Sequence, residues 1–225
     1  VIAGRDMVGL SKLSVLDGTG LWCLPGLVQT HVHLCQTLFR NQAEELPLLD
    51  WLQQRIWHLE AALDEDALDA SARLGIAELF ASGTTCILDM GTVRHTDVLF
   101  EAAKQSGLRF TGGKAMMDDP ASFPALRELS DDSLADSDRL ATRWDGKENG
   151  RLRYAYAPRF ALSCTDRLLR AVGERVAGGG RLHTHASESA AECEIVRKSR
   201  GMSNIRYLER TGLCGARSVL AHCVH

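Results

Sequence analysis

The regular alternation of short apolar segments with longer segments of helical periodicity is the feature that most constrains how this chain can fold. The short segments have the composition of buried β-strands, and most of them follow a Gly, Arg or Thr. They cover residues 26–33, 84–90, 108–117, 151–158, 181–186 and 218–224. Helical segments between successive strands are typical of a parallel sheet that helices cover. The pattern therefore predicts an α/β protein, either a doubly wound sheet or part of a (β/α)8 barrel.

Residues that favour helix ends flank several of the helical segments. Asp64 and Thr165 each stand directly before an apolar-periodic run and are expected N-caps. The polar-faced segment over residues 124–144 predicts one long helix, and a break near residues 130–133 stays open.

The composition is that of a globular domain. The 225 residues are 45% hydrophobic and 24% charged, with a net charge of −3 and no basic stripe. This balance argues against nucleic acid as a partner and leaves a nucleoside-sized substrate open. Seven cysteines without a CxxC pair indicate reduced thiols, as expected of a cytoplasmic protein. No apolar run is long enough to predict a membrane span, and assembly as a homo-oligomer stays open.

Two histidines end the first predicted strand, in the sequence PGLVQTHVH at residues 25–33. Side chains two residues apart in a strand point to the same face, so His31 and His33 project together. Two imidazoles that converge from one strand end can form the first half of a divalent-metal site. The alternative is that one of them is a hydrogen-bonded structural histidine and the other lies in solvent.

A second histidine pair, His183 and His185, ends the fifth predicted strand, and Glu188 follows in the turn. Metal-assisted hydrolysis requires a ligand and a nearby proton shuttle, which a histidine and a glutamate on one turn can provide. By the same alternation, His183 can also point inward. The alternative is that Glu188 only caps the helix that begins there.

The sixth predicted strand also ends in a histidine, His222. Taken alone, it is more typical of a core histidine than of a ligand. Three clusters of histidines at strand ends are more typical of a functional site, because parallel α/β folds form their sites at the carboxyl ends of their strands. Their joint occurrence favours a metal-dependent site.

The order and spacing of these motifs resemble the metal-dependent amidohydrolase superfamily. The opening signature combines DGxG, PG and HxH, and an HxxE motif and a later histidine follow in order. Several stretches resemble the branch of S-adenosylhomocysteine, methylthioadenosine and 5′-deoxyadenosine deaminases, alongside the s-triazine hydrolases. These stretches are THVHLCQTLFR at 30–40, LDWL at 49–52, IWHLE at 56–60 and GKAMMD at 113–118. The resemblance implies an incomplete (β/α)8 TIM-type barrel over residues 23–225, preceded by a β-sandwich remnant over residues 1–22.

The resemblance also implies roles for the histidines and the glutamate. His31, His33 and His185 match the ligands of one divalent metal ion, most commonly Zn²⁺, with Fe²⁺ and Mn²⁺ open. Glu188 matches the acid/base that protonates a ring nitrogen of the substrate. His222 matches the histidine that aligns the attacking hydroxide, or that binds a second metal ion in binuclear members.

Four further residues match substrate-binding positions of the family. Glu60 matches a carboxylate that takes ribose hydroxyls, and Trp51 precedes it on the same helical segment. Lys114 stands where an arginine is common, and Arg159 stands where adenosine-type deaminases often have a histidine. The alternative for Glu60 is a solvated charge, and for Trp51 a core aromatic. The departures at Lys114 and Arg159 leave the substrate less defined than the reaction.

The expected function is hydrolytic deamination of an aminopurine nucleoside such as 5′-deoxyadenosine or S-adenosylhomocysteine. One alternative is a ring hydrolase or chlorohydrolase of the s-triazine type, and another is a non-catalytic metal-binding barrel fragment. The superfamily also uses an Asp at the end of strand 8, which lies outside these 225 residues. We therefore expect a fragment of a longer gene product, inactive as an isolated chain.

Overall fold

The computed structural model describes residues 16–42 and 45–225, and its strands follow the predicted order. The strands are β1 (Leu27–Val32), β2 (Thr84–Asp89), β3 (Arg109–Gly112), β4 (Ala115–Met116), β5 (Leu152–Tyr154), β6 (Ala157–Pro158), β7 (Leu182–Ala186) and β8 (Ser218–His222). Each of them lies within a segment that the apolar pattern predicts. The third and fourth predicted strands are each interrupted, so that β3 with β4, and β5 with β6, replace one continuous strand.

All strand pairs are parallel. Hydrogen bonds join the first sheet in the order β1-β2-β3-β5, and β4 pairs with β6 and β7 with β8. A bridge between Tyr156 and Leu182 continues the pairing toward β7. The interruption between β3 and β4 lies at Gly113, where an added Cβ atom would stand 1.8 Å from the carbonyl oxygen of Ala155. The two backbone segments can approach this closely because glycine has no side chain.

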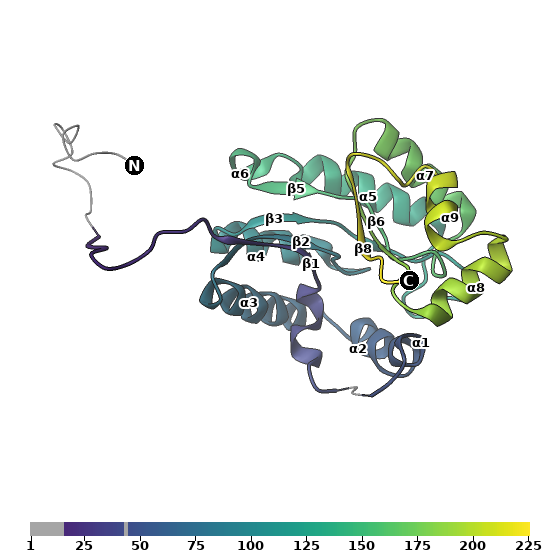
Figure 1. Ribbon diagram of the computed structural model, residues 1–225, viewed down its shortest axis with the longest axis horizontal. Coiled ribbons are helices and arrows are strands. Elements are labelled where there is room, and N and C mark those ends of the chain that lie inside the picture. Colours follow the sequence, from purple (N-terminus) through teal and green to yellow (C-terminus); the bar gives the residue numbers. More distant parts are fainter. Residues whose placement is uncertain (1–15, 43–44) are drawn as a thin grey trace.

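Helices connect the strands, as Figure 1 shows. The α-helices are α1 (Leu48–Trp51), α2 (Trp57–Ala61), α3 (Glu65–Ala81), α4 (Thr96–Ser106), α5 (Ser130–Trp144), α6 (Lys147–Gly150), α7 (Asp166–Ala177), α8 (Ala190–Arg200) and α9 (Asn204–Arg210). A 3-10 helix, η1 (Leu34–Phe39), follows β1, and a π-helical turn, η2 (Leu52–Ile56), joins α1 to α2. The architecture is therefore an α/β fold with parallel sheets.

The two expected N-caps are present. The side chain of Asp64 accepts a hydrogen bond from the amide of Ala67, at 2.8 Å, and that of Thr165 accepts one from Leu168. Each cap satisfies an amide of the first helical turn that has no partner within the helix.

The long helix expected over residues 124–144 is wrong in its first part, because α5 begins at Ser130. The segment before it closes a short turn of its own, in which the amide of Arg127 donates to the carbonyl of Phe123 at 3.0 Å, and it also bonds to residues distant in sequence. The amide of Glu128 donates to the carbonyl of Met117 at 2.9 Å, and the hydroxyl of Ser122 donates to that of Ser163 at 3.2 Å. These bonds to distant residues hold the segment apart from α5, so that it does not continue as one helix.

A buried core fixes the strands against the helices. Helices α3 and α4 lie along one side of β1, β2 and β3 in Figure 1. Phe100 of α4 stacks on Trp144 of α5, with ring centroids 5.2 Å apart, and meets Phe110 of β3 edge-on. These rings are buried and hold the outer surface of the sheet to its helices. The helices of this core thus leave the carboxyl ends of the strands free of these aromatic contacts.

The predicted β-sandwich remnant lies largely outside the described residues. Its described part, residues 16–22, contains neither helix nor strand and is exposed. Across the described ranges, no helix is long and apolar enough to cross a bilayer.

Candidate metal centre

Five imidazoles meet at the carboxyl ends of β1, β7 and β8, and we call them the histidine cluster. Its members are His31, His33, His183, His185 and His222. The ring centroids of His31 and His222 lie 4.9 Å apart, although β1 and β8 stand at opposite ends of the strand order. The strands therefore curve so that the first and the last bring their ends together.

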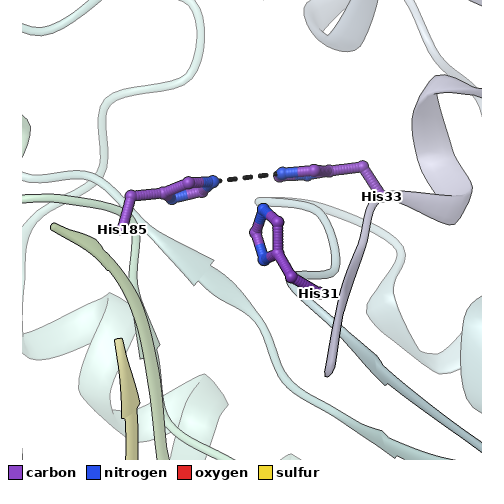
Figure 2. Close-up of side chains that lie close together, drawn as sticks. All are labelled: His31, His33 and His185. Carbon is purple, nitrogen blue, oxygen red and sulfur yellow. Dashed lines mark hydrogen bonds between the residues drawn. The ribbon is translucent and has the colours of Figure 1, made fainter. Parts of the chain in front are cut away.

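His31, His33 and His185 present their nitrogens to one point. One ligand nitrogen of each lies within 4.8 Å of the others, and the Nε2 atoms of His33 and His185 are 3.1 Å apart. Figure 2 shows the His31 ring standing between the other two and turned across them. Two nitrogens at zinc-ligand distance of about 2.0–2.1 Å, in a tetrahedral arrangement, stand about 3.3 Å apart. The three histidines could therefore bind a metal ion with little rearrangement.

Burial keeps these imidazoles neutral. It lowers the pKa of His31 to about 4, and the neighbouring His222 acts in the same direction. Burial also lowers the pKa of His33 and of His185 well below the ordinary value. Neutral imidazole is the form that coordinates a metal ion. The Nδ1 atom of His185 lies 2.7 Å from the carbonyl oxygen of Arg159, an outer contact that leaves its Nε2 for a ligand bond.

Glu188 and His222 stand beside this triad. The Oε2 atom of Glu188 lies 3.5 Å from Nε2 of His222, and both share a possible ligand group with His185. Burial raises the pKa of Glu188 to about 7, and the nearby Glu192 adds to the shift. A carboxyl group with such a pKa can both donate and accept a proton near neutral pH. The cap of α8 is Ser189, whose hydroxyl accepts from the amide of Glu192 at 3.2 Å, and not Glu188.

A pocket of about 210 Å³ opens in front of the histidine cluster. Glu188 and all of the cluster except His183 line one side of it. The other side, which we call the pocket wall, consists of Gln36, Leu48, Trp51, Leu52, Arg159 and Phe160. Trp51 and Arg159 of the sequence prediction thus reach the pocket together with the histidines.

Glu60 lies behind this wall and does not line the pocket. Its carboxylate accepts two hydrogen bonds from the Arg159 guanidinium and a third from the Gln36 amide, at 2.7 Å. Glu60 and Arg159 are 5% and 4% exposed, so the ion pair is buried. A buried arginine and glutamate that bond in this two-pronged way hold one another in a fixed geometry. Glu60 therefore orients Arg159 and Gln36 in this structure.

Lys114 is not brought to the pocket. Its Nζ atom lies 2.8 Å from Glu128 and 3.7 Å from Asp136, and it also donates to the carbonyl of Val93. These partners lie in the segment before α5, in α5 and after β2. Lys114 thus joins separate parts of the fold, and its substrate role stays a prediction.

Two neighbours of the site were missed by the sequence reasoning as assigned residues. Gln36 lies in a 3-10 helix that no periodicity predicted, although it stands three residues after His33. Asp89 ends β2, and its Oδ1 atom accepts from the amide of Leu34 at 2.8 Å, which holds the turn after His33. Its position at a predicted strand end was the one signal that could have drawn attention to it.

Comparison with known protein families shows which family has this sequence. The model of the amidohydrolase family matches residues 22–225. The chain belongs to the amidohydrolase family.

Two curated members of the family show which kinds of amidohydrolase the chain is similar to. This amidohydrolase is 37% identical, over 212 residues, to a 5′-deoxyadenosine deaminase of Methanothermobacter thermautotrophicus. It is 34% identical, over 216 residues, to a 5-methylthioadenosine/S-adenosylhomocysteine deaminase of Carboxydothermus hydrogenoformans. The matches cover 94% and 95% of the chain but 48% of each relative. The chain thus spans about half the length of the curated relatives it matches.

Solved structures agree with the family. A guanine deaminase of E. coli superposes with a TM-score of 0.80 at 30% identity, over 89% of this chain and 47% of that one. An adenosine deaminase of Xanthomonas campestris with bound zinc superposes with a TM-score of 0.77 at 29% identity, over 87% and 44%. The fold matches such deaminases over about half of their length, and at least one of them binds zinc.

Proposed function

We propose that this amidohydrolase acts in the hydrolytic deamination of aminopurine nucleosides, such as 5′-deoxyadenosine or S-adenosylhomocysteine. The observation that carries the proposal is the meeting of three neutral imidazoles, Glu188 and His222 at the mouth of one pocket. The names of the curated relatives support the adenosine-type branch. The described strands would be the first six of an eight-stranded barrel, with β3 and β4 counted as one interrupted strand and β5 and β6 as another.

The proposed metal ligands are His31, His33 and His185, and Zn²⁺ fits the donor set because zinc accepts neutral imidazole nitrogens in a tetrahedral site. When bound, zinc supplies Lewis-acid activation of a water molecule. The carbonyl of Arg159 holds the ring of His185 in place, so that this ligand is oriented before a metal ion arrives.

Glu188 is the proposed proton carrier. Its pKa of about 7 places it near the pH at which a general acid/base is most effective. It would protonate a ring nitrogen of the purine, take up a proton from the attacking oxygen, and pass that proton to the departing amine. His222, 3.5 Å from Glu188, would hold the attacking oxygen in line with the carbon that carries the amine.

The pocket wall would bind the heterocycle. Trp51, Leu52 and Phe160 offer apolar surface for a planar ring, and they exclude water from the reacting atoms. Glu60 would reach a ribose only if its bonds to Arg159 and Gln36 opened.

The direct test is an assay of ammonia release from 5′-deoxyadenosine and S-adenosylhomocysteine, with the full-length protein that contains this chain. We expect zinc-dependent deamination of at least one of them. Absence of turnover with both, in zinc-loaded protein, would reject the nucleoside proposal. Turnover of an s-triazine instead would favour the ring-hydrolase alternative.

A second candidate is deamination of an oxopurine base such as guanine, and Arg159 is the observation that favours it. A guanidinium has five N–H donors, and Glu60 takes two of them, so donors remain that can face the pocket. Guanine has a ring carbonyl that could accept such a bond, whereas adenine has none. The carboxylate expected to take ribose is already engaged by Arg159, which suits a substrate without a sugar. The structural match to a guanine deaminase supports this candidate.

Guanine added to the same assay separates the two candidates. If the base is the substrate, guanine is deaminated faster than either nucleoside, and Arg159→Gln lowers kcat/KM for guanine most. If both nucleosides exceed guanine, the second candidate is rejected.

A further inference from the structure

His183 is the one member of the histidine cluster that the proposed function leaves without a role. It is fully buried in β7, two residues before His185, and it does not line the pocket. Its Nε2 atom lies 2.8 Å from Nδ1 of His31. The other nitrogen of His31, Nε2, is therefore the one left for a metal ion.

A hydrogen bond between two imidazole nitrogens holds a single proton, so two arrangements exist. In the first, His31 Nδ1 carries the proton and donates it to His183, and Nε2 of His31 keeps a free lone pair. In the second, His183 Nε2 donates, and a neutral His31 then carries its own proton on Nε2. Only the first arrangement lets Nε2 of His31 bind a metal ion.

The first arrangement leaves a proton on the far side of His183. There a neutral His183 carries its proton on Nδ1, which is buried and has no partner of good hydrogen-bond geometry among the described residues. The proposed metal centre selects the first arrangement, because the second puts a proton on the His31 nitrogen that is left for a metal ion.

We propose that His183 is a positioning residue, which accepts the Nδ1 proton of His31 and so fixes the tautomer and ring orientation that expose Nε2 to the metal ion. The inference rests on the proposed metal centre. Partners of this kind change metal affinity by about 10- to 100-fold when they are lost. A buried imidazole that only filled space would contribute packing and leave metal affinity unchanged.

Two substitutions separate the roles. Glutamine can place its amide oxygen close to the position of Nε2 and still accept from His31, whereas leucine fills similar space and accepts nothing. The measurement is the Kd of Zn²⁺ for this chain, by competition with a chromophoric chelator, with circular dichroism as a check of folding. His58→Leu is the control for losing a histidine elsewhere, because His58 is exposed and packs on Phe123.

We expect His183→Leu to weaken zinc binding by about 10- to 100-fold and His183→Gln to stay within about threefold of wild type. Equal zinc affinity in wild type and His183→Leu would overturn the inference and leave the metal centre standing. Absence of zinc binding by the wild type would overturn the metal centre, and the inference with it.

A second measurement does not depend on the folding of a variant. Long-range ¹H–¹⁵N spectra of the zinc-loaded wild type report which nitrogen of His31 carries the proton. A proton on Nδ1 is the expected result. A proton on Nε2 would overturn the inference, because that atom could not then be the ligand.

Discussion

The two sides of the pocket differ in how their residues are held. The histidine cluster stands on strand ends, where backbone alternation sets the direction of each side chain. The pocket wall takes its polar groups from helices and a loop, and there Arg159 and Gln36 are oriented by the buried Glu60. The side-chain positions of the histidine cluster, the metal side, thus depend on the backbone. Those of the pocket wall, the substrate side, depend on a side-chain network. Substitutions on the metal side should therefore affect the chemistry, and substitutions on the substrate side should affect stability.

The largest effect is expected for Glu188→Gln in the full-length protein. Glutamine cannot carry a proton between ring nitrogen and amine, so kcat should fall by about 10²- to 10⁴-fold. Zinc content should stay at the wild-type level, because the proposed ligands are untouched. Glu194→Gln, at a half-exposed position of α8 where the glutamate pairs with Arg197 and Lys198, is the matched control and should leave kcat unchanged. Unaltered turnover in zinc-loaded Glu188→Gln would favour a role without this proton transfer.

The next effect is a loss of stability on the substrate side. Arg159→Leu leaves Glu60 buried without its cation, which should lower the free energy of unfolding by about 3–5 kcal/mol. Lys114→Met is the comparison, because its partners Glu128 and Asp136 are 23% and 40% exposed and can regain water. Urea unfolding of this chain measures both. A larger loss for Lys114→Met would contradict the view that Arg159 and Glu60 hold the wall.

These two regions also differ in how far the sequence predicted them. The HxH and HxxE spacings, with the histidine that ends the sixth predicted strand, predicted that these side chains lie together, since strand alternation and a common strand edge determine their positions. For the long basic side chains, sequence position does not determine the partner. Lys114 lies within the third predicted strand and Arg159 directly follows the fourth, but tertiary contacts direct one to acidic groups outside the pocket and the other into its wall.

The fold shows the same division. Strand order and the caps of α3 and α7 follow from local patterns, and the sequence predicted them. The start of α5 does not, because Glu128 bonds to Met117, which is distant in sequence. The breaks within the third and fourth predicted strands also depend on a close contact between Gly113 and Ala155, which no local pattern reveals.

Zinc should stabilise the chain through the histidine cluster alone. At a free zinc concentration of 100 times Kd, the free energy of unfolding should rise by about 2.7 kcal/mol. Thermal unfolding with and without zinc measures the rise. His185→Ala should abolish it, whereas Trp51→Ala should keep it, because Trp51 belongs to the pocket wall. Loss of the zinc effect in Trp51→Ala would show that the two sides are not independent.

The last prediction concerns Asp89, which supports the metal side by holding the turn after His33. Burial raises the pKa of Asp89 to about 7, although the amides of Leu34 and Gly91 oppose the shift. A raised pKa in the folded state favours the protonated form, so this group stabilises the fold at low pH. Its contribution is complete below the unfolded pKa of about 3.9 and is lost as the pH rises through 7.

Asp89→Asn keeps an acceptor for Leu34 and removes this titration. Relative to wild type, the variant should gain at most about 1.4 kcal/mol of stability per pH unit between pH 4 and 7, and no more above pH 7. Urea midpoints of both proteins over this range measure the difference, in which the titration of the histidines cancels. A difference that does not change with pH would mean that Asp89 is ionised throughout, with its charge solvated by the amides around it. The turn after His33 would then be held by a charged group, and the metal side would depend on electrostatics as much as the pocket wall does.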